Sequence, residues 1–168
     1  MAACQVSLRV GEVARNRATA LEAIFAAAAA GASVIVLPEL APSGYVFESQ
    51  AEARAAAEPA GGPTVTEWAA AAAGLGVVIV GGFAELGDDG RLYNSAALVD
   101  ASGTRAVYRK AHLWDAEKLV FTPGDTAPPV IDTELGRVGV MVCYDLEFPE
   151  WTRLAALDGA TKIGRAHV

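Results

Sequence analysis

The chain has 168 residues, of which 53% are hydrophobic and 20% are charged, and its formal net charge is −7. This composition excludes an intrinsically disordered chain, because it supplies enough apolar surface for the core of one domain. The negative charge excludes an extended nucleic-acid-binding surface, and no block of Lys and Arg residues indicates an anionic membrane as a partner.

The cysteine content and the N-terminal sequence indicate in which cellular compartment the protein is expected. Cys4 and Cys143 lie far apart, without the spacing of a disulfide framework or a zinc site, and this usage fits a reducing compartment. The opening "MAACQVSLRVGE" lacks the basic start and apolar stretch of a secretory leader. The two longest uncharged runs fall short of the ~20 strongly apolar residues that a membrane helix needs. We therefore expect a cytoplasmic protein without a membrane partner.

The first half of the chain predicts strands that alternate with helices. "ACQVSL" predicts a short strand, and residues 13–30 predict a helix that stops at Gly31. "SVIVLPEL" is a continuous apolar strand, as expected in a sheet covered on both faces. A second helix is expected from Thr64, which would cap it with Glu67 as the partner in a capping box. "GVVIVGGFAE" predicts the next buried strand.

The second half predicts a hairpin, a strand and a helix. "RLYNSAALVD" and "TRAVYRKAHL" are separated by the turn residues "ASG", as in a hairpin. "GRVGVMVCYD" predicts a further strand, and Pro149 suits the first turn of the helix "PEWTRLAALDG". This order predicts an α/β fold with helices packed over largely buried sheets. No internal repeat or linker indicates a domain boundary.

Three polar residues stand at the ends of apolar strands. They are Glu39 in "VIVLPEL", Lys110 in "VYRKAHLW" and Cys143 in "VMVCYD". In α/β folds, ligands bind at the carboxyl ends of strands. If the three side chains converge there, the thiolate would be a nucleophile and the carboxylate would move its proton. The ammonium would stabilise an oxyanion. Spacing alone does not bring the three together.

The same stretches carry a resemblance to a known family. "VLPELAPSGY", "YRKAHLWDAEKLVFTPGD" and "GVMVCYDLEFPE", together with "NSAALVD" and "CQV", resemble the nitrilase superfamily of carbon–nitrogen hydrolases. The resemblance implies a four-layer αββα sandwich and a catalytic triad of Glu39, Lys110 and Cys143. It also implies that Glu117 positions Lys110 and contacts the substrate amide, and that the backbone N–H of Tyr144 helps to bind the oxyanion. It implies no metal and no organic cofactor.

The reaction implied by this resemblance is hydrolysis of a non-peptide C–N bond in a small amide. The products would be an acid and ammonia, formed through a cysteine thioester. "CYDLEFPE" and Glu117 favour amides over nitriles, and N-carbamoyl compounds are a third substrate class within the superfamily. The resemblance also implies a homo-oligomer built on dimers.

Other interpretations of the same residues stay open. A lone cysteine at a strand end is more often an inert core thiol. His112 would be the base of a Cys-His hydrolase, although no Asn or Asp that would orient it is evident in the sequence. Glu39, His112 and Asp115 would form a metal site, but they lack i, i+4 ligand spacing. Candidates for the wall of an acyl pocket are Tyr45, Trp114 and Trp151.

The end of the chain departs from the family pattern. Members are longer, and further strands and helices are expected after "LAALDGA". The final "KIGRAHV" resembles the translation of a sequencing-adapter read-through, although a natural frayed tail is the alternative. We therefore expect residues 1–161 to be an incomplete, C-terminally truncated carbon–nitrogen hydrolase domain and residues 162–168 to be an artefact. Arg165 and His167 would then have no functional meaning. A non-catalytic fragment that associates through its open sheet edges is the competing hypothesis.

Overall fold

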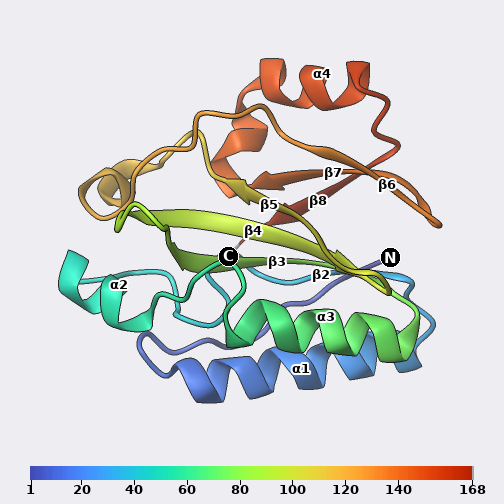
Figure 1. Ribbon diagram of the computed structural model, residues 1–168, viewed down its shortest axis with the longest axis horizontal. Coiled ribbons are helices and arrows are strands. Elements are labelled where there is room, and N and C mark those ends of the chain that lie inside the picture. Colours follow the sequence, from blue (N-terminus) through green and yellow to red (C-terminus); the bar gives the residue numbers. More distant parts are fainter. Residues whose placement is uncertain (168) are drawn as a thin grey trace.

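A computed structural model describes residues 1–167 (Figure 1). Its α-helices are α1 (Val13–Ala29), α2 (Gln50–Ala56), α3 (Pro63–Leu75) and α4 (Pro149–Leu157). Its strands are β1 (Ala2–Ala3), β2 (Val34–Val36), β3 (Val78–Leu86), β4 (Leu92–Asp100), β5 (Gly103–Arg109), β6 (Val130–Thr133), β7 (Gly136–Val142) and β8 (Lys162–Ala166). Short 3-10 helices span Asp115–Leu119 and Cys143–Glu147.

The strands form two sheets. The larger sheet has the order β1-β2-β3-β4-β5, with parallel pairing from β1 to β3 and antiparallel pairing from β3 to β5. The smaller sheet has the order β6-β7-β8, in which β6 is antiparallel and β8 is parallel to β7. Both sheets are therefore mixed.

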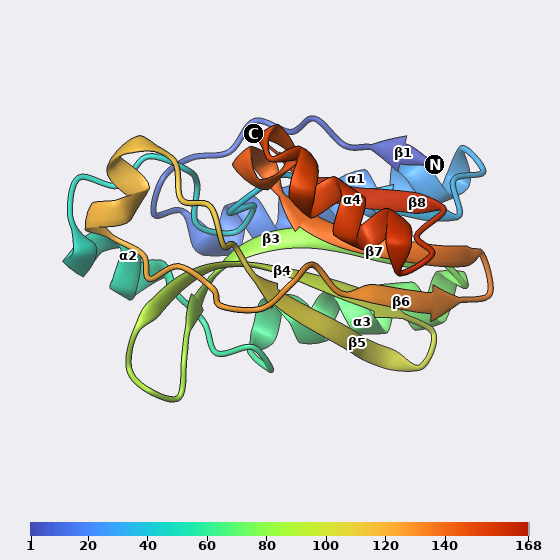
Figure 2. The same ribbon diagram turned by 90° about the horizontal axis from the view of Figure 1, so that it is seen from above.

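The two sheets and the helices make four layers. Helices α1 and α3 cover the outer face of the larger sheet, and α4 lies on the outer face of the smaller sheet (Figure 1). Seen from above, α4 lies over β7 and β8 (Figure 2). The α/β class and the four-layer sandwich predicted from the sequence are confirmed.

Apolar side chains fill the space between successive layers. Ile24 of α1, Trp68 of α3 and Ile79 of β3 belong to the core under the helices, and all three are fully buried. Between the sheets, Val80 of β3 packs in one cluster with Val140 of β7. Each large side chain removed from water contributes roughly 1.5–3 kcal/mol before entropy is considered. These contacts fix how the two sheets lie relative to each other.

Several local predictions were incomplete or wrong. The first strand covers only Ala2–Ala3, and α2 and β6 were not predicted. The capping box at Thr64 is wrong, because α3 begins at Pro63, whose fixed φ suits the first helical position. The Thr64 hydroxyl instead donates to Glu58 Oε1 at 2.9 Å. Glu67, the expected capping partner, forms an ion pair with Arg17.

The end of the described chain extends the smaller sheet. Val138 of β7 pairs with Lys162 of β8, and Val142 pairs with Ala166. Gly164 lies so close to the larger sheet that an added Cβ would be 2.6 Å from Val80 Cγ2. The expected artefactual origin of residues 162–168 stays a prediction; Val168 lies outside the described residues.

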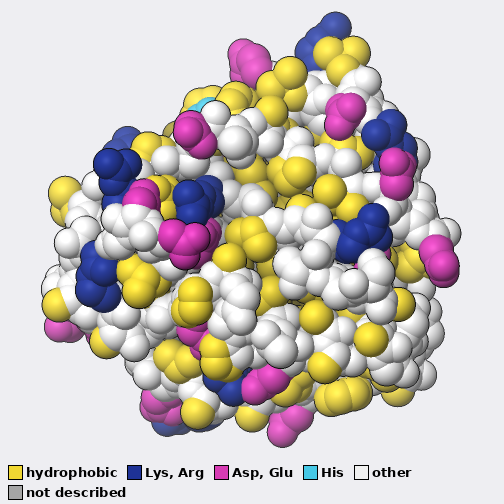
Figure 3. Space-filling view, viewed as in Figure 1, with side chains coloured by type: hydrophobic (Ala, Val, Ile, Leu, Met, Phe, Trp, Pro, Cys, Tyr) yellow, Lys and Arg dark blue, Asp and Glu magenta, His cyan; other side chains and the backbone are white. Residues whose placement is uncertain are grey.

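Charges of both signs are distributed over one face of the molecule (Figure 3). On the face shown in Figure 3, acidic and basic side chains alternate with apolar ones. Among residues 1–167, no helix combines the length and the apolar character required to cross a bilayer.

Candidate active site

The three residues expected to carry the chemistry lie together where the two sheets meet. Glu39 is in the loop that follows β2, Lys110 directly follows β5, and Cys143 directly follows β7. The first two come from the larger sheet and the third from the smaller sheet. Each side chain thus lies just beyond the carboxyl end of a strand, as α/β sites generally require.

Lys110 is the centre of a buried ion cluster. Its Nζ donates to Glu39 Oε1 at 2.6 Å and to the two carboxylate oxygens of Glu117 at 2.9 and 2.8 Å. Lys110 and Glu39 are both 0% exposed. A charge removed from water is tolerated only when it is paired and hydrogen-bonded, so these three side chains depend on one another.

The cluster holds two carboxyl groups for one amine, and this shifts their protonation. Burial opposes the charge on Lys110, but the Glu39 and Glu117 carboxylates outweigh it and raise the pKa of the ammonium. Burial raises the pKa of Glu39, and the Lys110 ammonium offsets this only in part. A carboxyl group with a raised pKa is suited to accept a proton near neutral pH and return it.

Polar neighbours hold the two carboxylates in place. Asn94 Nδ2 donates to Glu39 Oε1 at 2.6 Å and to Glu117 Oε1 at 3.2 Å. The Tyr45 hydroxyl donates to Glu117 Oε1 at 2.9 Å, and the Trp114 backbone N–H donates to Glu117 Oε2 at 2.8 Å. Asn94 was not singled out from the sequence. The signal was present, because an amide inside the apolar strand "NSAALVD" needs a buried partner.

The backbone is strained at Cys143 and at Leu40, the residue after Glu39. Cys143 begins the 3-10 helix after β7 with a φ of 39°, and Leu40, next to Glu39, has a φ of 51°. Non-glycine residues avoid this left-handed region, which costs roughly 1–3 kcal/mol per residue. Such strain gathers at functional sites, where the surrounding structure maintains it.

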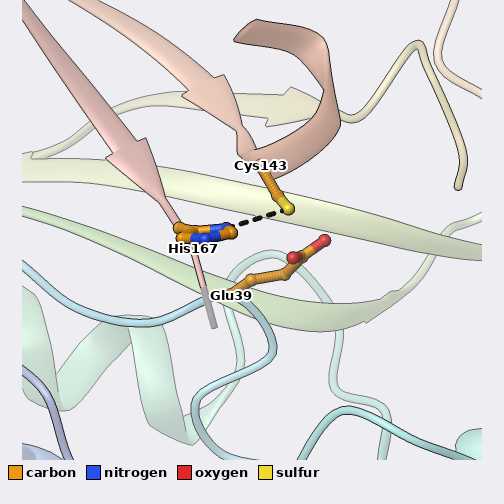
Figure 4. Close-up of side chains that lie close together, drawn as sticks. All are labelled: Glu39, Cys143 and His167. Atoms are coloured by element: carbon orange, nitrogen blue, oxygen red, sulfur yellow. Dashed lines mark hydrogen bonds between the residues drawn. The ribbon is translucent and has the colours of Figure 1, made fainter. Parts of the chain in front are cut away.

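The thiol of Cys143 lies beside the carboxylate of Glu39. An oxygen of Glu39, the sulfur of Cys143 and a ring nitrogen of His167 lie within 4.8 Å of one another (Figure 4). Burial, together with the Glu39 carboxylate, raises the pKa of the Cys143 thiol to about 11, while Lys110 opposes the shift. The thiol is therefore protonated at neutral pH and needs a base. Glu39 Oε2 is buried and has no hydrogen-bond partner among residues 1–167, so it can accept that proton.

A pocket of about 460 Å³ opens over the thiol. Glu39 and Cys143 line it, and Tyr45, Trp114 and Tyr144 contribute aromatic walls. This size suits a small molecule. Tyr144 directly follows Cys143, and the role of its backbone N–H in binding an oxyanion stays a prediction.

Residues from the final segment also reach this pocket. His167 Nδ1 lies 3.0 Å from Cys143 Sγ, and Arg165 Nε donates to the Cys143 carbonyl at 3.0 Å. Both residues belong to the segment that resembles an adapter read-through, so we assign them no role.

The alternatives that used His112 gain no support from its position. His112 Nδ1 lies 2.8 Å from Asp145 Oδ1, and its ring stacks on Phe148 with 3.7 Å between centroids. Asp145 is an orienting carboxylate that the sequence did not reveal. Within residues 1–167, the acidic, thiol and imidazole groups close enough to share a metal ion are Glu39, Cys143 and His167, and neither His112 nor Asp115 is among them.

Comparison with known proteins identifies the family of this chain. Residues 1–166 match the family model of the carbon-nitrogen hydrolases. The chain is 41% identical over 160 residues to a nitrilase from Pyrococcus abyssi and 40% identical over 156 residues to an (R)-stereoselective amidase from Pseudomonas. It also resembles the solved structure of an amidase from Nesterenkonia sp. AN1, with a TM-score of 0.79 and 27% identity over 97% of the chain. The chain belongs to the carbon-nitrogen hydrolase family.

The match covers these relatives only in part. The aligned region is 95% of this chain but 61% of the Pyrococcus nitrilase, and 93% of this chain but 55% of the Pseudomonas amidase. For the Nesterenkonia amidase, 65% of that chain is covered. Another structure of that amidase shows acrylamide added to its active-site cysteine.

Proposed function

We propose that the whole protein hydrolyses a non-peptide C–N bond of a small amide, giving an acid and ammonia through a thioester on Cys143. The observation that carries the proposal is the buried ion pair of Glu39 and Lys110 beside the Cys143 sulfur. This arrangement puts a proton acceptor and a nucleophile in the wall of one pocket, and it pairs the acceptor with a buried positive charge.

In the first half-reaction, Cys143 gives its proton to Glu39 as the sulfur attacks the carbonyl carbon. A C–S bond forms and the π electrons move to oxygen, where the Lys110 ammonium and the Tyr144 backbone N–H stabilise the charge. When the carbonyl re-forms, the C–N bond breaks and the nitrogen takes the proton from Glu39. Ammonia leaves and the thioester remains.

In the second half-reaction, water attacks the thioester carbon. Glu39 accepts a proton from the water and returns it to the Cys143 sulfur as the C–S bond breaks, so the acid is released and the enzyme is restored. Glu117 has two parts in this scheme. It holds Lys110 through two hydrogen bonds, and it contacts the substrate amide.

Amides are the favoured substrate class, and two others within the family are alternatives. The similarity to an (R)-stereoselective amidase supports amides. The Pyrococcus relative is a nitrilase, and a tomato relative, 40% identical over 157 residues, is an N-carbamoylputrescine amidase. Nitriles and N-carbamoyl compounds are therefore the competing classes.

The test is turnover of panels of small amides, nitriles and N-carbamoyl compounds by the full-length enzyme, followed by ammonia release. Cys143→Ala should lose all turnover, and Cys4→Ala, the matched control, should keep it. Turnover retained in Cys143→Ala would refute the mechanism. The 168-residue chain is assayed beside the full-length enzyme, and activity only in the latter identifies this chain as a non-catalytic fragment.

We also propose that residues 1–161 form part of this hydrolase domain and that residues 162–168 are not native. Partial coverage of the relatives supports the first statement, and the resemblance of "KIGRAHV" to adapter sequence supports the second. The gene sequence downstream of Ala160 tests both.

The full-length enzyme is proposed to be a cytoplasmic, dimer-based oligomer. The free cysteines Cys4 and Cys143 fit a reducing compartment. Leu154 and Leu157 of α4 are 44% and 73% exposed and offer apolar surface for subunit contact. Light scattering of the full-length enzyme measures its oligomeric state.

A further inference from the structure

Asp145 is a buried carboxylate that lies two residues after the nucleophile. It is 0% exposed, and it is not one of the residues that line the pocket over Cys143. Its Oδ1 accepts from the His112 backbone N–H at 3.0 Å and lies 2.8 Å from His112 Nδ1. Its Oδ2 accepts from the Tyr108 hydroxyl at 3.0 Å and from the Val142 backbone N–H at 3.2 Å. Four interactions therefore hold one carboxylate.

The partners of Asp145 come from both sheets. Tyr108 and His112 lie two residues before and two residues after Lys110, at the end of the larger sheet. Val142 is the last residue of β7 in the smaller sheet and precedes Cys143. Asp145 therefore connects the backbone around the ammonium to the backbone around the thiol.

Aromatic contacts fix the groups that bind Asp145. The Tyr108 hydroxyl accepts from Trp151 Nε1 at 2.9 Å, and burial together with Asp145 raises the pKa of Tyr108, so the hydroxyl keeps its proton and donates it. The His112 ring stacks on Phe148 and meets Trp151 edge-on, with 4.5 Å between the centroids. The donors are thus oriented before any substrate is bound.

We propose that Asp145 is a positioning residue that sets the Cys143 sulfur relative to Glu39 and Lys110. Its bond to the Val142 N–H fixes the peptide immediately before Cys143, whose φ of 39° an unsupported turn would relax. Its bonds to His112 and Tyr108 tie that turn to the segment that carries Lys110. The inference rests on the proposed function, in which the three side chains act together.

An asparagine at this position conserves the shape and removes half of the acceptors. Both Asp145 oxygens face donors, whereas an asparagine presents one oxygen and one NH₂ group. In Asp145→Asn, the NH₂ group must therefore point at either the His112 backbone N–H or the Val142 backbone N–H. Two donors then face each other, and that hydrogen bond is lost. Asp145→Asn should therefore free the backbone of either His112 or Val142 without changing the size of the side chain.

The first measurement is the rate at which iodoacetamide alkylates Cys143 at pH 9. The effect of Glu39→Gln on this rate is compared between the wild-type protein and the Asp145→Asn variant. Removing the Glu39 carboxylate lowers the pKa of a thiol held next to it, so Glu39→Gln should speed Cys143 alkylation about 15- to 75-fold. In the Asp145→Asn background this factor should fall below about 3-fold, because the sulfur no longer lies against Glu39. The alkylation rate of Cys4 in the same molecule shows whether the whole fold has become less stable. Asp158→Asn makes the same chemical change at an exposed position and serves as the control. An equal factor in both backgrounds overturns the inference.

The second measurement is amide hydrogen exchange, which does not depend on the chemistry. Asp145→Asn should speed exchange at the backbone N–H of Val142 or His112 by at least about 10-fold relative to the strand amides. Tyr108→Phe, which removes one donor and leaves both backbone bonds, should leave these two amides protected. If Glu39→Gln has no effect on wild-type Cys143, the proposed function fails and hydrogen exchange decides the inference alone. Unchanged protection at both amides in Asp145→Asn overturns it.

Discussion

Replacing Glu39 with Gln separates two effects of this carboxylate. As a negative neighbour it raises the pKa of the Cys143 thiol, so its removal should lower that pKa and increase the thiolate fraction. As the base of the proposed reaction it is needed for every proton transfer. Glu39→Gln should therefore speed alkylation of Cys143 and abolish amide turnover by the full-length enzyme.

The size of the first effect follows from the geometry. The Glu39 oxygen and the Cys143 sulfur lie within 4.8 Å of each other. Two unit charges at that separation interact by about 3.5 kcal/mol at an effective dielectric of about 20, and by about 1.7 kcal/mol at about 40. The thiol pKa is about 11, so only a small fraction is ionised at pH 9. Lowering the pKa by these energies makes alkylation about 15 to 75 times faster at that pH.

The assay is iodoacetamide labelling at pH 9, with the labelled peptides of Cys143 and Cys4 quantified by mass spectrometry. The Cys4 rate should not change, and Glu134→Gln, which alters an exposed carboxylate, serves as the matched control. Unchanged alkylation of Cys143 in Glu39→Gln would refute the reasoning, because the carboxylate would then not lie beside the thiol. Slower alkylation would refute the predicted direction, because the action of Glu39 as a base would then outweigh the effect of its charge.

Two further predictions concern the stability of the site. Lys110→Met leaves Glu39 and Glu117 buried without a cation, so the free energy of unfolding should fall by about 3–5 kcal/mol at pH 8. Because burial raises the pKa of Glu39, this group gains a proton in the folded state as the pH falls, and the loss should be smaller at pH 5. Urea unfolding at both pH values measures it, and an equal loss would contradict the explanation. In Gly82→Ala, the added Cβ would lie 2.6 Å from Glu39 Cα, which should lower the free energy of unfolding by about 1–3 kcal/mol. Gly74→Ala, in α3 with nothing within 4 Å of the new Cβ, should raise it by up to about 1 kcal/mol, and thermal unfolding of the pair tests the contrast.

Much of the fold could be predicted from local sequence patterns. Continuous apolar runs predicted β3 and β7, and the turn residues "ASG" predicted the hairpin of β4 and β5. Glu39, Lys110 and Cys143 stood out because each is a polar residue at the end of such a run. The pattern could not show that they meet, because their proximity depends on how the two sheets dock.

The predictions that failed share a physical reason. Thr64 and Glu67 have the spacing of a capping box, but Pro63 begins the helix and tertiary partners take both side chains. The sequence does not identify the distant partners of Asp145 and Asn94, such as His112, 33 residues from Asp145, and Glu39, 55 residues from Asn94. Pairings of this kind are found only when the tertiary structure is known.

The division of the site between two sheets has a consequence for biosynthesis. Cys143 follows a strand of the smaller sheet, whereas Glu39 and Lys110 follow strands of the larger sheet. A nascent chain that has formed only the first five strands carries no nucleophile, and one whose layers have not joined presents an ordinary sulfhydryl. Under the proposed function, the Cys143 thiol would therefore become reactive toward amides only after the two sheets have docked.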